Sequence, residues 1–154
     1  MKTRAPAVLL GSVLLAACSG GPSAAGQEHG EALAPCPGSP NCVSTQATDE
    51  AHRIEALEYK DLAGAAVEAV RGATMEALVR VVEQTRRTRI VRRTDTYLHA
   101  EYRTRLGFVD DVEFLFDDAT RRVHFRSASR VGHSDLGVNR KRMEGFRELY
   151  RTVR

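Results

Sequence analysis

The chain lacks an apolar run long enough to cross a membrane, and it has only three cysteines among its 154 residues. Its longest apolar run spans 7–17, about 11 residues, whereas a spanning helix needs roughly 20. The sequence also contains no G-x-S-x-G, the motif that places the nucleophile of α/β-hydrolases. These absences argue against an integral membrane protein and against that class of hydrolase.

The N-terminal segment has the pattern of a secretory signal, because Lys2 and Arg4 precede the apolar run at 7–17. The run ends in Leu15-Ala16-Ala17-Cys18, which resembles the lipobox of bacterial lipoproteins. We therefore expect residues 1–17 to be a lipoprotein signal peptide.

The lipobox resemblance implies that Cys18 is acylated and becomes the mature N-terminus. The protein is then attached to the membrane without spanning it. Each buried methylene contributes about 0.8 kcal/mol to membrane binding, so one acyl chain anchors a protein only marginally, whereas several anchor it durably. Ser19 stands where aspartate would imply retention in the inner membrane, so we expect the periplasmic face of the outer membrane. The alternative is an ordinary cleaved signal with an accidental Cys18.

The net charge gives little information about partners. Two of the 23 basic residues lie in 1–17, which leaves 21 basic against 20 acidic residues and a formal net charge of +1. The arginine clusters at 86–89 and 140–142 could contact anionic lipid or a polyanion, but such runs are more often solvated faces. Because the protein is expected to be exported, we expect no nucleic-acid partner.

Small and polar residues fill 18–34, which predicts a flexible tether because such a segment buries too little apolar surface to become ordered. Cys36 and Cys42 follow and bracket a Pro-Gly-Ser-Pro-Asn turn. In an exported protein this pair most simply forms a disulfide. Free thiols, or metal or redox chemistry, are the alternatives, although a structural zinc site would need two further ligands.

Two segments with helical features flank a β-rich region. Thr74 is a suitable N-cap, and the apolar spacing that follows predicts an amphipathic helix to about Thr85. The alanine-rich 61–72 could be a loose helix or a loop, and 53–59 could be a short strand. A final helix is expected to begin between 134 and 139, with these residues on its core face: Met143, Phe146, Leu149, Tyr150 and Val153.

Alternation of apolar and polar residues predicts strands from about 87 onward, with Leu98, Ala100 and Tyr102 facing the core. A two-residue turn at 106–107 would pair core with polar positions, whereas a three-residue connection restores apolar pairing. We therefore expect an odd-length loop there, with Gly107 at positive φ.

The hairpin 111–127 can be given a register. A turn at 118–119 pairs apolar residues on one face and charged residues on the other. The predicted pairs are Phe114 with Val123, Val112 with Phe125, Glu113 with His124, Asp111 with Arg126 and Asp110 with Ser127. The charged pairs are expected to form an ordinary solvent-facing surface.

These elements predict one α+β domain at 35–154, with an antiparallel sheet of about four or five strands covered by two helices. Three blocks, 36–44, 108–114 and 126–140, then occur in the order found in the family known as domain of unknown function 1499. The chain resembles that family from about 35 to 150. The resemblance implies almost nothing about activity.

Asp110 is the most distinctive candidate site residue, because the register turns its carboxylate toward the core. An unpaired buried charge there costs several kcal/mol, so the carboxylate must be hydrogen-bonded or neutralised. Two interpretations follow: Asp110 ties the following loop to the sheet through Ser127, Ser129 or backbone amides, or it lines a polar pocket. Such a pocket, next to a helix N-terminus, suits a small polar or anionic ligand. Its expected residues are Asp110, Ser127, Ser129, Arg130, Ser134, Asp135, Asn139 and Arg140.

Catalysis is a weaker interpretation. His133, Ser134 and Asp135 have the residue types of a hydrolase triad, but adjacent residues cannot all converge on one another. Alternation along the strand places Asp110 on the opposite face from Asp111 and Glu113, so only two carboxylates lie together, which argues against a metal site. We expect no cofactor and no metal. The remaining alternative to ligand binding or support of the cell envelope is a module that contacts an envelope protein.

Overall fold

The computed structural model describes residues 32–153. The expected signal peptide, Cys18 and the expected tether up to residue 31 lie outside the described residues. Leu33 and Ala34, at the end of the expected tether, are buried. Leu33 packs with Tyr97 and Leu115 on one face of the sheet.

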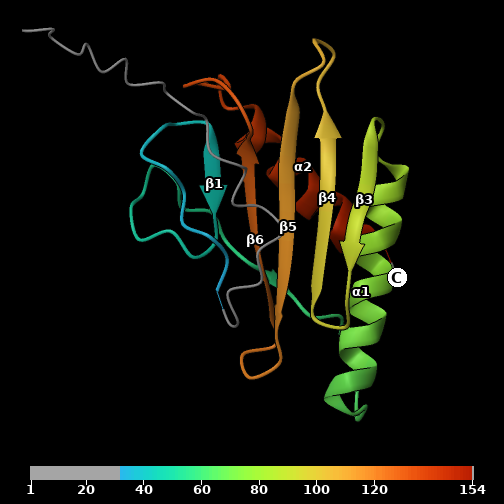
Figure 1. Ribbon diagram of the computed structural model, residues 1–154. Helices are drawn as coiled ribbons and strands as arrows, with labels where there is room; N and C mark the ends of the chain where they lie inside the picture. Colours follow the sequence, from blue (N-terminus) through green and yellow to red (C-terminus); the bar gives the residue numbers. More distant parts are fainter. Residues whose placement is uncertain (1–31, 154) are drawn as a thin grey trace, which may run out of the picture.

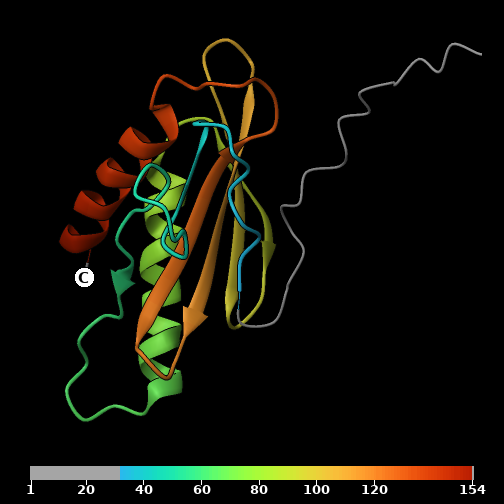
Figure 2. The same cartoon turned by 90° about the vertical axis from the view of Figure 1, so that its left-hand side faces the viewer.

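The domain is a two-layer α+β structure, as the sequence predicted, with one antiparallel sheet and both helices on the same face of it (Figures 1 and 2). The sheet has six strands in the order β1-β6-β5-β4-β3, and the two-residue β2 also pairs with β6. The elements are β1 (Cys42–Ser44), β2 (Leu57–Glu58), α1 (Val67–Gln84), β3 (Thr88–Arg93), β4 (Tyr97–Arg103), β5 (Val109–Asp117), β6 (Arg122–Ser129) and α2 (Val138–Thr152).

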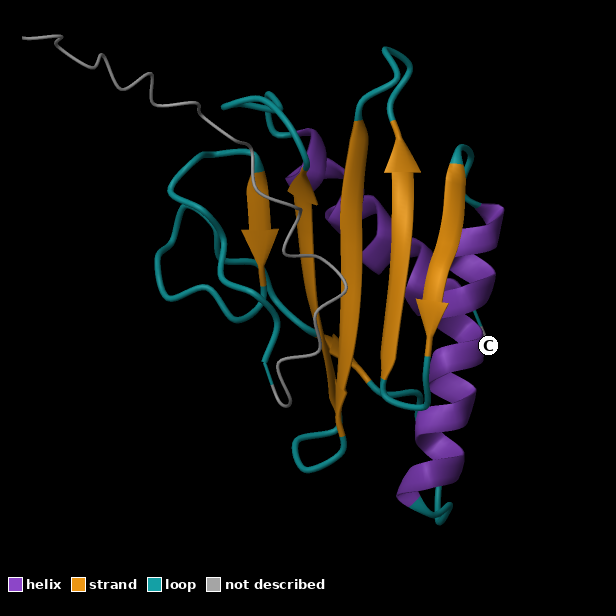
Figure 3. Ribbon diagram, in the orientation of Figure 1, coloured by secondary structure: helices purple, strands orange, loops and turns teal. Residues whose placement is uncertain are grey.

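The hydrophobic core lies between the two helices, which are purple in Figure 3, and the sheet, whose strands are orange. Alternation along the strands directs one set of side chains toward the helices, as period-two spacing requires. The ring of Phe114 lies 6.2 Å from that of Phe125 on β6 and 5.1 Å from that of Phe146 on α2. Leu98 and Ala100 of β4 are fully buried on the same face, as the sequence predicted.

Helix α1 begins eight residues earlier than predicted, with Ala66 at the N-cap position. Thr74 is not its N-cap but a buried mid-helix residue, and its Oγ1 accepts a hydrogen bond from the backbone N–H of Lys60 at 2.9 Å. The undecided segment 61–72 divides into a loop, with Gly64 at φ 75°, and the first turns of α1. Alanine has the highest helix propensity, and Val70 extends the buried stripe, so the helix continues upstream of the expected cap.

The two hairpins test the predicted registers. Gly107 has φ 89° and the connection between β4 and β5 has an odd length, as predicted, but it contains five residues, 104–108, rather than three. In the second hairpin the predicted register is wrong by two residues, because the turn contains four residues, 118–121, rather than two. The carboxylate of Asp117 accepts the N–H groups of Ala119 and Thr120 and thereby closes this longer turn.

The two-residue shift changes every predicted partner but leaves each side chain on its predicted face, since strands repeat every two residues. Phe114 faces Phe125, Glu113 faces Arg126 and Asp110 faces Ser129. The predicted pair of Glu113 with His124 does not form. Instead, the imidazole Nδ1 of His124 lies 3.1 Å from Thr45 Oγ1.

The face of the sheet away from the helices is also buried along its centre, which corrects the expectation of a solvent-facing surface. Asp111 and Glu113 are each 1% exposed, and His99 and Arg126 are nearly as buried. Glu113 accepts hydrogen bonds from the Tyr97 hydroxyl at 2.6 Å and from Arg126 at 3.1 Å. The sequence correctly predicted the charges on this face but not their burial.

Helix α2 begins at Val138, inside the predicted window. Met143, Phe146 and Tyr150 are buried on its core face as predicted, but Leu149 is 48% exposed. The hydroxyl of Tyr150 donates to the carbonyl of Glu58 at 2.8 Å, which ties α2 to β2.

Candidate functional site

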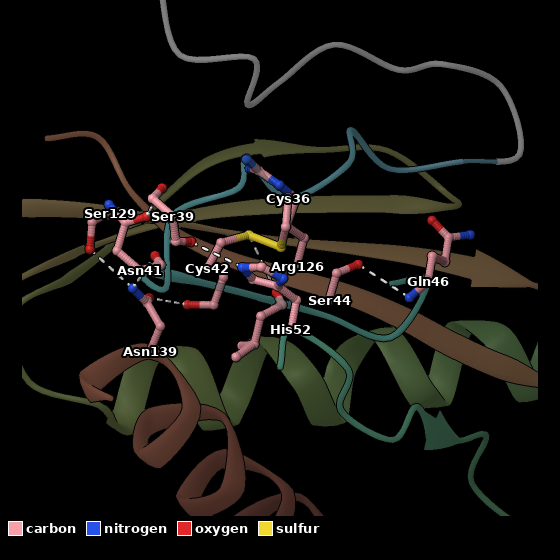
Figure 4. The surroundings of a disulfide bond; sticks show 12 residues. Cys36, Ser39, Asn41, Cys42, Ser44, Gln46, His52, Arg126, Ser129 and Asn139 are labelled. Carbon is pink, nitrogen blue, oxygen red and sulfur yellow. Dashed lines mark hydrogen bonds between the residues drawn. A yellow bond between two sulfur atoms is a disulfide. The ribbon is translucent and has the colours of Figure 1, made fainter. Parts of the chain in front are cut away.

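Three connections meet at one end of the domain, which we call the upper end: the β4–β5 loop at 104–108, the β6–α2 loop at 130–137, and the segment 36–41 that leads into β1 (Figure 1). The expected disulfide joins Cys36 to Cys42, with 5.7 Å between their Cα atoms (Figure 4). Because Asn41 Nδ2 donates to the carbonyl of Gly132 at 2.7 Å, the cross-linked loop is tied to the β6–α2 loop.

Asn139 is the centre of a buried polar cluster at this end (Figure 4). It is 1% exposed, and all the hydrogen-bonding capacity of its amide is used. Its Nδ2 donates to the carbonyl of Asn41 and to Ser129 Oγ, both at 3.0 Å, while its Oδ1 accepts from Ser127 Oγ at 2.5 Å and from Arg142 at 2.6 Å. The cluster therefore fixes the start of α2 against β1 and β6.

Asp110 faces the helix side of the sheet and is 1% exposed, as the sequence predicted for its orientation. Its main partner is Arg142 of α2, which donates to Oδ2 at 2.5 Å; the expected serines do not bond to it. The Arg142 guanidinium also lies 5.1 Å from the centre of the Tyr102 ring. Among the described residues, none donates a hydrogen bond to the second carboxylate oxygen, Oδ1.

Arg142 is a site residue that the sequence does not predict, because the basic cluster 140–142 has the pattern of a solvated face. A helical spacing signal could have identified it. Arg142 follows Asn139 by three residues, so both side chains lie on the same helix face, and it immediately precedes the buried Met143.

A groove of about 490 Å³ opens above Asp110, between the β4–β5 and β6–α2 loops. Leu106 and Phe108 form one wall and Leu136 belongs to the other, so the lining is mostly apolar. Polar groups come from Asp110, Ser129, Ser134 and Asp135. An apolar groove with few polar groups is typical of a small-molecule site.

The structure separates the predicted site residues into three groups. The first group lines the groove and consists of Asp110, Ser129, Ser134 and Asp135. Ser127 and Asn139 lie in the buried cluster below it. Arg130 and Arg140, which were expected to provide positive charge, are engaged elsewhere.

Arg130 binds Asp111 on the opposite face of the sheet at 2.7 and 2.8 Å, and Glu101 at 2.6 Å. The bonds to Asp111 and Glu101 raise the pKa of the Arg130 guanidinium, and Arg130 together with Arg89 lowers the pKa of Glu101. Arg140 donates to the backbone carbonyls of Ala51 and Arg53. Neither arginine lines the groove.

Asp135 organises the loop on its side of the groove. Its carboxylate accepts the backbone N–H of Gly137 at 2.9 Å and that of Asn139 at 2.6 Å, in the first turn of α2. Ser134 Oγ accepts the N–H of Leu136 at 3.3 Å. These bonds hold Leu136 outward, where its side chain is 94% exposed.

In 32–153, no group of three or more His, Cys, Asp and Glu side chains is arranged to hold a metal ion. Neither α1 nor α2 is long and apolar enough to cross a membrane.

The sequence model of one protein family, described as a protein of unknown function (DUF1499), matches residues 32–149. The chain belongs to this family. The match starts at the first described residue and ends within α2, so it includes every strand and the whole groove. No curated protein and no solved structure is significantly similar to the chain.

Proposed function

We propose that this member of the DUF1499 family is an exported envelope lipoprotein whose domain binds a small amphipathic molecule without chemical conversion. The basic residues before the apolar run, and the lipobox-like sequence ending at Cys18, support export and acylation. The Cys36–Cys42 disulfide supports an oxidising compartment. Ser19 supports the periplasmic face of the outer membrane, by the resemblance already described.

The groove at the upper end is the observation on which the binding proposal rests. It combines exposed apolar walls with a buried carboxylate whose Oδ1 has no described donor. This oxygen is therefore available to a ligand, and a head group that donates to it would form a charge-assisted hydrogen bond. The apolar part of the same ligand would cover Leu106, Phe108 and Leu136.

The charges around the groove favour a head group that donates hydrogen bonds, such as an amine or a hydroxyl, over an anion. Both charged side chains in the lining, Asp110 and Asp135, are acidic. Arg142 is paired with Asp110, and Arg130 and Arg140 point elsewhere. An anionic head group would therefore meet two carboxylates and no available guanidinium.

The ligand class is tested with three ten-carbon probes, namely decylamine, decanol and decanoate. We expect decylamine and decanol, added below their aggregation concentrations, to raise the melting temperature of the purified chain, and decanoate to leave it unchanged. Stabilisation by none of the three would refute binding in the groove, and stabilisation by decanoate equal to that by decylamine would refute the donor head group.

A matched pair of leucine substitutions locates the binding. Leu136→Ala removes a groove side chain that is 94% exposed, and Leu149→Ala removes an exposed leucine of α2 outside the groove. We expect only Leu136→Ala to weaken decylamine binding, by about fivefold or more for the loss of most of a buried leucine. Equal affinities of the two variants would place the ligand elsewhere.

The anchor is tested separately on cells that express the full chain. The mass of the mature protein should correspond to a chain that begins at an acylated Cys18, and Cys18→Ser should abolish acylation and release the protein from the membrane fraction. An unmodified Cys18 in the mature chain would refute the anchor without affecting the groove.

A further inference from the structure

Exposed apolar side chains gather at the upper end of the domain. The described residues include eight exposed large apolar side chains, and five of them lie on or beside the two loops that flank the groove. Their exposed fractions are 84% for Leu106, 52% for Phe108, 59% for Val131, 94% for Leu136 and 43% for Val138. Apolar patches of this kind mark interaction surfaces, whereas single exposed leucines need no explanation.

Exposed arginines lie beside this apolar patch. Arg86 and Arg87 form the turn between α1 and β3, and Arg103 and Arg105 lie at the base of the β4–β5 loop. The two pairs are adjacent, because the backbone N–H of Arg103 donates to the carbonyl of Arg87 at 2.9 Å. None of these four arginines forms an ion pair with another described residue.

The acidic residues at this end do not balance the four arginines. Glu101 already binds both Arg89 and Arg130, and the carboxylate of Asp135 accepts two backbone N–H groups. Glu83, in the last turn of α1, is an exposed carboxylate nearby. The upper end therefore has an excess of positive charge next to protruding apolar side chains.

We propose that the upper end docks on the surface of a lipid bilayer that contains anionic lipid. Leu106 and Leu136 enter the boundary between head groups and acyl chains, and Arg86, Arg87, Arg103 and Arg105 lie at the level of the lipid phosphates. Apolar side chains combined with basic residues are what interfacial membrane binding requires. Each arginine near such a surface strengthens the attraction by about fivefold at moderate salt.

The geometry of the chain is compatible with a lipid at Cys18. Thirteen residues separate Cys18 from Ala32, and the fourteen Cα–Cα steps between the two span at most about 50 Å. The nine residues of β5 extend about 30 Å from one end of the sheet to the other. An anchor at Cys18 therefore permits the upper end to face the bilayer, and docking adds an orientation that the anchor alone does not impose.

The absence of tryptophan allows a direct test with single reporters in the full chain. Leu106→Trp and Leu136→Trp place an indole at the two loop tips. Leu62→Trp places one at a position 43% exposed in the loop before α1, at the lower end of the domain (Figure 2). Fluorescence is measured with vesicles of phosphatidylcholine and phosphatidylglycerol whose acyl chains are brominated, because bromine quenches only an indole that enters the acyl region.

We expect strong quenching for Leu106→Trp and Leu136→Trp and almost none for Leu62→Trp. Quenching at none of the positions would refute docking, as would equal quenching at all three, which indicates membrane contact without orientation. Quenching does not require a ligand in the groove, so failure of the decylamine experiment leaves this result unaffected.

The contribution of the arginines to binding anionic lipid is tested by neutralising two of them in the Leu136→Trp background. Arg103→Gln with Arg105→Gln should lower the affinity for vesicles with phosphatidylglycerol by about tenfold or more, from two arginines near the surface. The control pair, Arg121→Gln with Arg122→Gln, neutralises two exposed arginines at the lower end and should leave the affinity unchanged. Equal losses in both pairs, or equal quenching by pure phosphatidylcholine vesicles, would refute the requirement for anionic lipid.

Discussion

The two faces of the central strands are equally buried but differ in chemistry. On the helix side, Val112, Phe114 and Phe125 are completely buried among apolar side chains. On the opposite side, Asp111 and Glu113 are each 1% exposed, and their described partners are charged or polar. The comparison shows that the same burial arises in two ways: by removing apolar area from water, or by pairing buried charges with opposite charges and polar groups. The pairing is not complete, since Arg126 Nε is buried without a described hydrogen-bond partner.

The largest effect should come from the apolar face. Phe114→Ala removes a ring that contacts Phe125 and Phe146, and the cavity it leaves should lower the free energy of unfolding by about 3–5 kcal/mol. Urea unfolding measures the loss. Leu149→Ala, at an exposed position, is the control and should change stability by at most about 0.5 kcal/mol. Similar losses for both would contradict the position of the core.

A slightly smaller loss should follow when one charge on the other face is removed. Glu113→Leu leaves the buried guanidinium of Arg126 without its carboxylate and the Tyr97 hydroxyl without its acceptor. An uncompensated buried charge should cost about 3 kcal/mol, again measured by urea unfolding. A variant as stable as the parent would show that Glu113 and Arg126 are solvated in solution.

Removing both charges tests whether the loss of stability in Glu113→Leu comes from the unpaired charge that remains on Arg126. In Glu113→Leu with Arg126→Met neither residue carries a buried charge, and such replacements are often neutral or stabilising. We expect the double variant to recover at least half of the loss caused by Glu113→Leu alone. A double variant no better than the single one would show that these two charges are not coupled.

The free energy of unfolding should depend on pH through the charged face, because its carboxylates take up protons in acid, whereas apolar side chains do not titrate. Arg130 and Arg89 lower the pKa of Glu101 in the folded protein. Because the folded pKa lies below the unfolded value of about 4.3, the contribution of Glu101 is present above that pH and is lost as the pH falls through the folded pKa. The stability difference between the parent and Glu101→Gln should therefore shrink between pH 6 and pH 3. A constant difference would contradict the ion pairs.

The smallest effect should come from removing Arg89, the exposed partner of Glu101. The side chain of Arg89 is 71% exposed and binds Glu101 at 2.9 Å. An exposed ion pair contributes at most about 1 kcal/mol, so Arg89→Ala should change the free energy of unfolding by about 0.5 kcal/mol or less. A loss as large as that of Glu113→Leu would show that burial does not determine the strength of these pairs.

The sequence by itself determined the α+β class, the faces on which the residues of β4, β5 and β6 lie, the positive φ of Gly107 and the start of α2 within a few residues. These features depend on local periodicity and on the conformational freedom of glycine, which neighbouring residues reveal. The inward orientation of Asp110 was predictable for the same reason.

Tertiary structure alone decided the register of the second hairpin, because a shift of two residues preserves both faces and so leaves the alternating pattern equally satisfied. It also decided the partners of the long charged side chains. Arg142 reaches Asp110, whereas Arg130 reaches Asp111 on the other face, because side chains of this length bind whichever carboxylate the folded backbone brings near. The groove exists only where the β4–β5 and β6–α2 loops meet, and no local pattern encodes that meeting.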